Sequence, residues 1–147
     1  MNTRVVVTGG AGFIGREAIR KFVAAGYDVL CFDLAEQISR HKDILNEIGE
    51  LGCLTLAHGS ILDRNSLRNA MDGADIVIHL AAMLGVKKTE DNKLGCIEVN
   101  ITGTDNVLAA AVTHGVKKFI FASSSEVYGE PDTNPITELQ TTKGKTV

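Results

Sequence analysis

The chain has 147 residues, about the length of one ordinary domain, and its 44% hydrophobic and 22% charged residues are typical of a globular protein. The net charge of −3 and the lack of any lysine or arginine run longer than two residues argue against a nucleic-acid partner. No apolar stretch reaches the roughly 18 residues that a membrane span requires. We therefore expect a cytoplasmic protein that binds neither nucleic acid nor membrane.

Short apolar runs alternate with stretches of helical spacing. In chain order, the pattern predicts a strand at 4–8, a helix at 12–25, a strand at 28–33, a helix at 39–51, a strand at 53–58, a short helix from residue 63 or 65 to 71, a strand at 75–80, a helix at 92–114 and a strand at 117–122. Strands that alternate with helices pair in parallel through right-handed crossovers. The expected fold class is α/β, a doubly wound parallel sheet (Rossmann) of five strands.

The three cysteines give no sign of a metal or disulfide site. Cys31, Cys53 and Cys96 are an odd number at wide spacing, and no Cys-x-x-Cys or Cys/His pair accompanies them. Cys31 and Cys53 lie in apolar runs, so we expect both to be small buried hydrophobic residues.

The segment between the first strand and the first helix is rich in glycine. It reads TGGAGFIG over residues 8–15, with glycines at 9, 12 and 15. Glycine permits a tight turn with positive φ, and the lack of a Cβ lets a pyrophosphate approach the backbone. The N–H groups and partial positive charge at the start of the helix favour an anion. In this strand–loop–helix context the motif predicts a dinucleotide site.

An acidic residue, Asp33, ends the second predicted strand. A carboxylate there can accept both hydroxyls of an adenosine ribose and repels a 2′-phosphate. No arginine follows it directly, since the next residues are Leu34, Ala35 and Glu36. The cofactor predicted from these residues is therefore NAD rather than NADP.

With these motifs the sequence resembles the extended short-chain dehydrogenase/reductase family, in particular its NAD-dependent sugar-nucleotide epimerases and dehydratases. The resemblance covers almost the whole chain. It rests on TGGAGFIG (8–15), Asp33, GSILD (59–63), HLAA (79–82), VNITGTDNVLAAA (99–111) and FASSSEVYG (121–129). It implies an NAD-binding Rossmann domain at residues 1–128, followed by a loop or tail at 129–147 that leads toward a catalytic helix.

The resemblance also implies the residues that form the site. Ser124 matches the family's catalytic Ser/Thr, which hydrogen-bonds the sugar hydroxyl that is oxidised. Cofactor contacts are implied at Gly9, Gly12, Phe13, Ile14, Gly15, Asp33, Leu34, Ser60, Ile61, Leu80, Ala81, Ala82, Asn100 and Ser123. Ser60 departs from the family pattern, because an acidic residue usually stands there against the adenine amine. For His79 we prefer a structural role, a buried ring whose hydrogen bonds go to the backbone.

The family's general base, the tyrosine of a Tyr-x-x-x-Lys pair, is not found in these 147 residues. Tyr27 has Cys31 four residues later, and Tyr128 has Asp132. A base of this kind removes the sugar hydroxyl proton during hydride transfer. We therefore interpret the chain as truncated, without the C-terminal substrate domain, and expect no turnover from it alone.

The resemblance leaves the reaction open. We favour the NAD-binding portion of a sugar-nucleotide epimerase that acts through a transient 4-keto sugar. A UDP-glucuronate decarboxylase is the runner-up, because Ser125–Glu126 resembles those enzymes. A 4,6-dehydratase is less favoured, because such enzymes usually have an acidic residue before that glutamate and this sequence has Ser125 there. A stand-alone, non-catalytic NAD-binding module is the alternative from another class.

A homodimer or other self-association is also expected. The predicted helix at 92–114 carries apolar residues on more than one face, and only one face can cover the sheet. These residues are Leu94, Ile97, Ile101, Val107, Leu108, Ala111 and Val112. Exposed apolar strips of this kind mark interfaces, and the strand at 117–122 is expected to be a free sheet edge.

Overall fold

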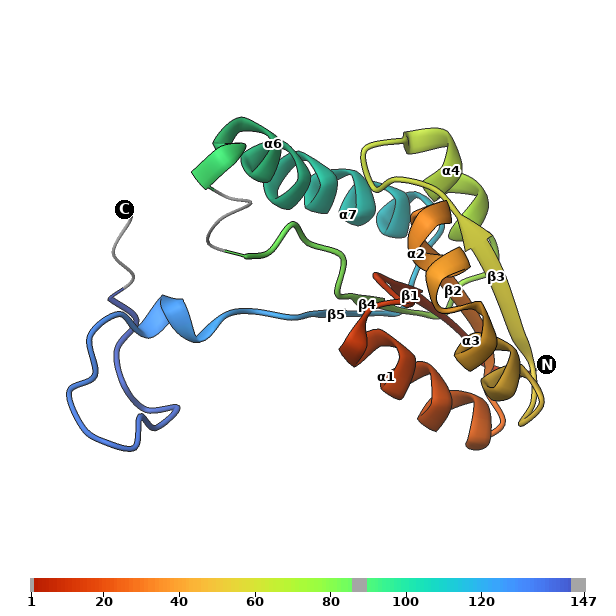
Figure 1. Cartoon of the computed structure of the whole chain (residues 1–147), viewed down its shortest axis with the longest axis horizontal. Helices are drawn as coiled ribbons and strands as arrows, with labels where there is room; N and C mark the ends of the chain where they lie inside the picture. The colour runs from red at the N-terminus through yellow and green to blue at the C-terminus, as the bar shows by residue number, and fades with distance from the viewer. Residues whose placement is uncertain (1, 86–89, 144–147) are drawn as a thin grey trace.

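The computed structural model describes residues 2–85 and 90–143 and contains a single parallel sheet with helices on both faces (Figure 1). The sheet strands are β1 (Arg4–Thr8), β2 (Asp28–Asp33), β3 (Leu54–His58), β4 (Ile76–His79) and β5 (Lys118–Phe121). The helices are α1 (Phe13–Ala24), α2 (Ala35–Arg40), α3 (Lys42–Gly49), α4 (Arg64–Ala70), α6 (Lys93–Ile97), a π-helical segment (Glu98–Gly103), α7 (Thr104–Thr113) and a 3-10 turn (Ser125–Tyr128).

The strand order is β3-β2-β1-β4-β5, and all neighbours are parallel. The chain moves outward from β1 to β3 and then returns to the other side of β1 with β4. The carboxyl ends of β1 and β4 therefore flank the point at which the winding direction reverses, where open α/β sheets bind ligands. The prediction of a five-stranded, doubly wound α/β sheet is confirmed.

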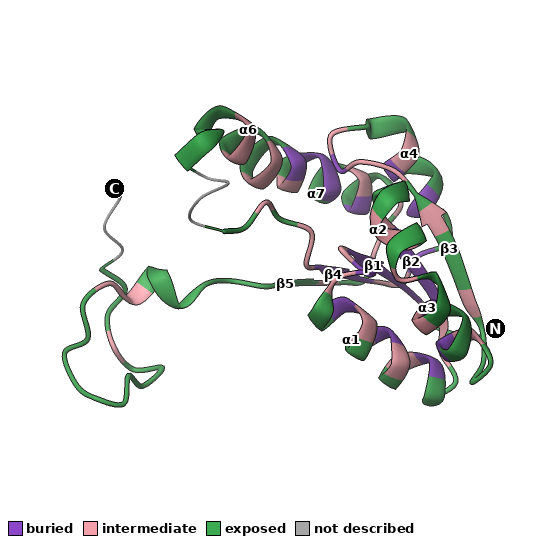
Figure 2. Cartoon of the chain, in the orientation of Figure 1, coloured by how far each residue is buried: buried purple, intermediate pink, exposed green. Residues whose placement is uncertain are grey.

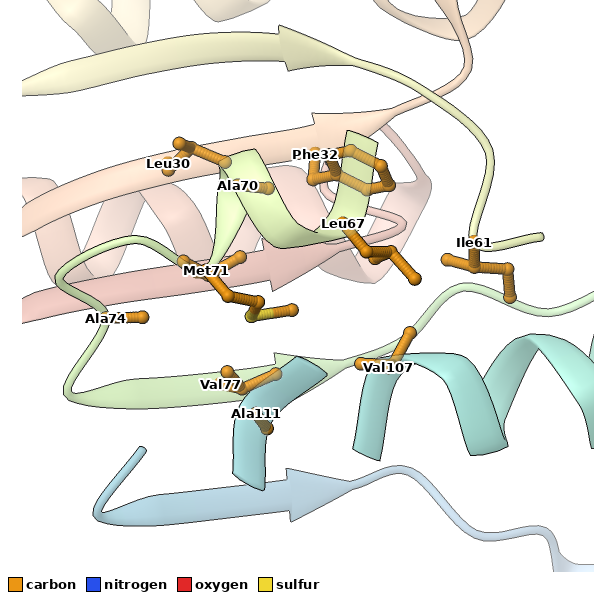
Figure 3. Close-up of a cluster of buried hydrophobic side chains, with 11 residues drawn as sticks. Leu30, Phe32, Ile61, Leu67, Ala70, Met71, Ala74, Val77, Val107 and Ala111 are labelled. Carbon is orange, nitrogen blue, oxygen red and sulfur yellow. The ribbon is translucent and has the colours of Figure 1, made fainter. Parts of the chain in front are cut away.

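Alternating side chains of the central strands supply two separate cores. Val6, Leu30 and Phe32 point to the face covered by α4 and α7. Figure 3 shows this core, in which Leu67 and Met71 meet Val107 and Ala111. Val5, Val7 and Cys31 point to the opposite face, where α1 and α3 add Ile19, Val23, Leu45 and Ile48. Burial on both faces explains why these strands are continuous apolar runs instead of alternating ones.

The predicted helix at 39–51 is in fact two shorter helices. The first, α2, begins at Ala35, earlier than the spacing indicated, and α3 follows after His41. Only α3 buries apolar side chains, Leu45 and Ile48, whereas α2 buries none. The apolar spacing therefore revealed α3 and missed α2, because periodicity detects only the helices that have a face in the core.

The prediction for Cys53 was wrong, and that for Cys31 was right. Cys31 is fully buried in β2, but Cys53 is exposed and lies just before the edge strand β3. Its Sγ is 3.4 Å from Oδ1 of Asp28. An apolar neighbourhood in the sequence did not distinguish a central strand from an edge strand, whose end is open to water.

The predicted helix at 92–114 is continuous but not uniform, because residues 98–103 form a π-helical segment between α6 and α7. Val107 and Ala111 are buried against the sheet. Val99 and Ala110 are partly buried against the same core. The other large apolar side chains of this helix are exposed: Leu94, Ile97, Ile101, Leu108 and Val112. Figure 2 shows this exposed side of the helix, and also the largely exposed tail after β5. None of the helices in the described ranges is long and apolar enough to cross a membrane.

Candidate functional site

The glycine-rich loop connects β1 to α1 at the carboxyl end of the sheet. The loop is anchored to β2, because the N–H of Gly9 donates to the carbonyl oxygen of Phe32 at 2.9 Å. It then closes on itself through the N–H of Gly12, which donates to the Gly9 carbonyl at 3.1 Å. The sequence-predicted glycines therefore form one tight turn at the start of a helix.

Two of these glycines are required by their surroundings. Gly9 has φ of +71°, and a Cβ on it would lie 2.7 Å from the backbone nitrogen of Ala81. A Cβ on Gly15 would collide with the Gly9 carbonyl oxygen and lie 2.7 Å from Cα of Gly10. The loop consequently packs against both its own helix and the backbone that follows β4, with no room for a side chain.

The start of α1 presents hydrogen-bond donors. The first N–H groups of a helix have no acceptor within it, and here these belong to Phe13, Ile14 and Gly15. The side chains of Phe13 and Ile14 are 87% and 66% exposed. Together with the partial positive charge of the helix end, these groups form a cradle suited to a phosphate.

Asp33 at the end of β2 is fixed beside this loop. Its Oδ2 accepts a hydrogen bond from the N–H of Ala11 at 3.0 Å, and its Oδ1 accepts one from the N–H of Leu34 at 2.8 Å. Burial raises the pKa of this carboxyl above its usual value, although the two N–H groups oppose the shift. The carboxylate is thus coupled to the glycine-rich loop through a single peptide.

Basic side chains gather around Asp33, and the sequence analysis missed them. The guanidinium of Arg16 donates to the carbonyl oxygen of Ala11 at 3.0 Å. His41 attracts Asp33 electrostatically, and its own pKa is lowered by desolvation and by Arg16 and Arg40. These side chains do not follow Asp33 directly in the sequence; the fold brings Arg16 from α1 and His41 from the α2–α3 junction close to it.

Ser60 and Ile61 follow β3 at the same edge of the sheet. The hydroxyl oxygen of Ser60 accepts a hydrogen bond from the N–H of Leu62 at 3.1 Å. Ile61 is 6% exposed, and its side chain fills the space that a Cβ on Gly103 would need. Its carbonyl oxygen accepts from Nδ2 of Asn106 at 3.1 Å. Ile61 therefore joins this loop to α7.

The segment after β4 contains Leu80, Ala81 and Ala82. The N–H of Leu80 continues the sheet by donating to the Thr8 carbonyl at 3.0 Å. Next to it, the Asn100 amide makes two bonds to one residue: its Oδ1 accepts from the N–H of Met83 at 2.8 Å and its Nδ2 donates to the Met83 carbonyl at 3.1 Å. Asn100 lies in the π-helical segment, so this segment holds the chain that leaves β4.

His79 is buried as predicted, but its partners are side chains and not the backbone. Its Nδ1 is 2.6 Å from the hydroxyl oxygen of Thr8, and its Nε2 is 3.0 Å from that of Thr104. Burial lowers the pKa of the ring to about 4, so the imidazole is neutral at physiological pH. Two threonines, far apart in the sequence, are the partners that strand pattern alone did not reveal.

Ser123 and Ser124 lie beyond the end of β5, and both are exposed. The Ser124 side chain caps the 3-10 turn, because its hydroxyl oxygen accepts from the N–H of Glu126 at 3.2 Å. That bond occupies a lone pair of the hydroxyl and leaves its proton available for another acceptor.

The packing contacts join most of the site residues predicted from the sequence. The glycine-rich loop contacts Asp33 through Ala11 and the Leu80–Ala81 backbone through Gly9. Asn100 is linked to the same segment through Met83. These contacts place the N–H donors at the start of α1 and the Asp33 carboxylate next to the same loop, whereas the bonds of Ser60, Ile61 and Ser124 go to Leu62, Asn106 and Glu126.

Comparison with known proteins gives a consistent picture. Residues 5–146 match the model of the NAD dependent epimerase/dehydratase family. A UDP-N-acetyl-alpha-D-glucosaminuronate decarboxylase of Bacillus cytotoxicus is 42% identical over 139 residues, which are 94% of this chain and 41% of that protein. A UDP-glucose 4-epimerase of Bacillus subtilis is 35% identical over 141 residues, covering 91% of this chain and 40% of that protein.

Solved structures agree with the sequence relatives. A UDP-glucose-4-epimerase from Stenotrophomonas maltophila, crystallised with NAD and formylated UDP-arabinopyranose, superposes with a TM-score of 0.87 at 30% identity, over 99% of this chain and 44% of that one. A dTDP-glucose 4,6-dehydratase from Streptomyces venezuelae with bound NAD gives a TM-score of 0.82 at 30% identity, over 96% and 45%. The chain spans less than half the length of each of these proteins.

Proposed function

Because this chain belongs to the NAD-dependent epimerase/dehydratase family, we propose that it is the NAD-binding portion of an enzyme that acts on nucleotide-sugars. The observation that carries the proposal is the junction of the glycine-rich loop, the start of α1 and Asp33. Ala11 ties the loop to the carboxylate at 3.0 Å, so donors for a diphosphate and an acceptor for a ribose are fixed relative to each other.

The residues of this junction fit the cofactor. The close approach of Gly9 and Gly15 to backbone leaves a cradle that a Cβ would fill. We propose that the N–H groups of Phe13 and Ile14 bind the diphosphate and that Asp33 accepts the hydroxyls of the adenosine ribose. Leu80, Ala81 and Ala82 would lie along the nicotinamide half. When bound, NAD supplies a reversible hydride acceptor.

The role of this chain in the chemistry would be to bind and orient. The hydroxyl of Ser124 would donate to or accept from the sugar hydroxyl that is oxidised, while its other bond to Glu126 holds it in place. Removal of the proton requires a general base, and neither tyrosine of the chain has a lysine four residues later. We therefore expect the 147-residue protein to bind NAD without turning over nucleotide-sugars.

Epimerisation at C4 through a transient keto sugar is our first candidate for the complete reaction. Decarboxylation of a nucleotide-linked uronic acid is the second, favoured by the Ser125–Glu126 pair and by the 42% identity to a decarboxylase. The products separate the two, since an epimerase returns a sugar of unchanged mass and a decarboxylase releases CO2. This assay needs a protein in which the present chain is followed by a Tyr-x-x-x-Lys helix.

Titration calorimetry with NAD and NADP tests the binding proposal on the chain itself. We expect NAD to bind more tightly, because Asp33 repels a 2′-phosphate. The guanidinium of Arg16, which is bonded to the Ala11 carbonyl beside Asp33, makes this a demanding test because it would attract that phosphate. Equal or tighter binding of NADP would contradict the assignment of Asp33. Binding of NAD together with full turnover of a nucleotide-sugar would contradict the proposal that these 147 residues bind and orient but do not complete the reaction.

A further inference from the structure

A buried chain of hydrogen bonds joins β1, β4 and the 93–113 helix behind the candidate site. His79 lies at its centre and is 1% exposed. Thr8 stands on one side of the ring and Thr104 on the other, at 2.6 and 3.0 Å. None of these three side chains was assigned a role in binding above, yet each is one step away from backbone that borders the site.

One fixed end and the neutral state of the buried ring together set the direction of the bonds between Thr8, His79 and Thr104. The hydroxyl of Thr104 is 2.7 Å from the carbonyl oxygen of Asn100, which can only accept, so the single proton of Thr104 is used there. Toward His79 the same oxygen must then accept, which requires a proton on Nε2 of the ring. A neutral imidazole has only one N–H, so its Nδ1 accepts the proton of Thr8.

Both ends of this hydrogen-bond chain reach the segment that follows β4, residues 80–83. At one end, the oxygen of Thr8 is left with a lone pair that faces the N–H of Ala81, at a longer distance of 3.5 Å. At the other end, the Asn100 backbone is held by Thr104, and the Asn100 side chain makes its two bonds to Met83. The ring thus couples the positions of Ala81 and Met83.

We infer that His79 and Thr104 are positioning residues: the Nε2-protonated, neutral imidazole holds residues 81–83 in place against the helix, at the point where the cofactor leaves the glycine-rich loop. The existence of the hydrogen-bond chain rests on the geometry, and the direction of its Thr8–His79 bond rests also on the neutrality of the buried ring. Its consequence for the nicotinamide half of the cofactor rests on the proposed function. Gly9 supports the location, because a Cβ on it would lie within 3 Å of the Leu80–Ala81 backbone.

The test compares two threonines of the same helix. Thr104→Val removes the hydroxyl that closes the chain, and Thr104→Ser retains it. Thr113→Val is the matched control. The Thr113 hydroxyl also donates to the carbonyl oxygen four residues earlier, that of Ala109 at 2.8 Å, but it does not belong to the hydrogen-bond chain through His79. Thermal unfolding of each variant shows whether the fold is intact.

Two readouts require no cofactor. Nitrogen-15 NMR of the wild-type ring should show a protonated Nε2 and a bare Nδ1 at pH 7; the opposite tautomer or an imidazolium would overturn the inference. Amide hydrogen exchange should become about tenfold faster at Met83 in Thr104→Val, and remain unchanged in Thr104→Ser and Thr113→Val. The N–H of Leu80, which is held by the sheet, serves as the internal reference. Unchanged exchange at Met83 would also overturn the inference.

Ligand binding then tests the consequence. ADP contains only the adenosine and diphosphate parts, whereas the nicotinamide half of NAD would extend along residues 80–82 in the proposed site. In Thr104→Val we expect NAD affinity to fall about fivefold, the effect of one lost hydrogen bond, with ADP affinity retained. An equal loss for both ligands would indicate general damage and overturn the positioning role. A wild-type protein that binds neither ligand would instead refute the proposed function, while the NMR and exchange results would still decide the hydrogen-bond chain.

Discussion

At the scale of single residues, Asp33 carries the sharpest expectation. Asp33→Ala should weaken NAD binding by about 1–3 kcal/mol, because it removes charge-assisted bonds to the ribose hydroxyls. Calorimetry measures this loss. Asp43→Ala is the control, an exposed aspartate in the first turn of α3 with no part in the site. An unchanged NAD affinity in Asp33→Ala would rule out the ribose contact.

The same carboxyl predicts how binding depends on pH. Since burial raises the pKa of Asp33, the ionised form that accepts ribose hydroxyls is lost at a higher pH than for an ordinary aspartate. We therefore expect NAD affinity to decline as the pH falls through this raised pKa, and the decline to be absent in Asp33→Ala.

His79 gives a prediction for stability. Its pKa is about 4 in the folded protein, against about 6.5 for an exposed histidine. The unfolded chain therefore binds the proton more readily, and folding loses stability as the pH falls from about 6.5 to 4, by up to roughly 3 kcal/mol. Urea unfolding over this range measures the effect. A folded His79→Gln variant should lose this part of the pH dependence, whereas replacement of the exposed His58 by Gln should not change it.

Sequence reasoning located the residues of the candidate site that belong to contiguous motifs. The glycines and Asp33 are recognisable because their spacing reflects a local strand–loop–helix unit. Thr8 and Thr104 are 96 positions apart, and their connection through His79 exists only after β1, β4 and α7 have packed. Arg16 and His41 were missed near Asp33 for the same reason. Long-range polar contacts leave no periodic pattern in a sequence.

At the scale of elements, the packing of α1 on its loop can be tested with two glycines. Gly15→Ala places a methyl group 2.7 Å from Cα of Gly10, so we expect a loss of about 1–3 kcal/mol in unfolding free energy. Gly49→Ala, at the end of α3, meets nothing within 4 Å and should be neutral or stabilising by up to about 1 kcal/mol. Denaturant unfolding of both variants gives the comparison; equal effects would contradict the close approach at Gly15.

Apolar runs and apolar spacing predicted all five strands and the helices α1, α3 and α7, and an N-cap residue, Asp63 or Asn65, predicted α4. The edge strands β3 and β5 were found in this way although neither has a buried residue. The short helix α2 has no buried residue and left no such repeat. The π-helical segment was also missed, since no pattern of apolar residues distinguishes it from the α-helix on either side.

At the scale of the whole molecule, the exposed apolar side of α6 and α7 predicts self-association. Leu94 and Val112 are each 80% exposed, and apolar patches of this kind mark interfaces. Light scattering over a concentration series should reveal the associated form. Leu94→Glu or Val112→Glu should weaken association roughly tenfold or more.

The control for this prediction is Leu139→Glu, since Leu139 is 95% exposed in the tail and lies outside the helix. It should leave association unchanged. If the wild-type protein stays monomeric at high micromolar concentration, the helix is not an interface between copies of this chain. If Leu139→Glu has the same effect as Val112→Glu, nonspecific charge repulsion accounts for both.

Because the π-helical segment Glu98–Gly103 lies between α6 and α7, the number of residues in this helix sets which way the side chains before the segment point relative to α7. Each residue of an α-helix turns the next side chain by about 100°, so deleting one residue after Asn100 would rotate the amide away from Met83 relative to α7. Leu94 and Ile97 would turn by the same angle relative to Leu108 and Val112. One deletion would therefore disturb both the loop after β4 and the arrangement of these exposed apolar side chains. We expect this stretch to admit changes of residue type far more readily than any insertion or deletion.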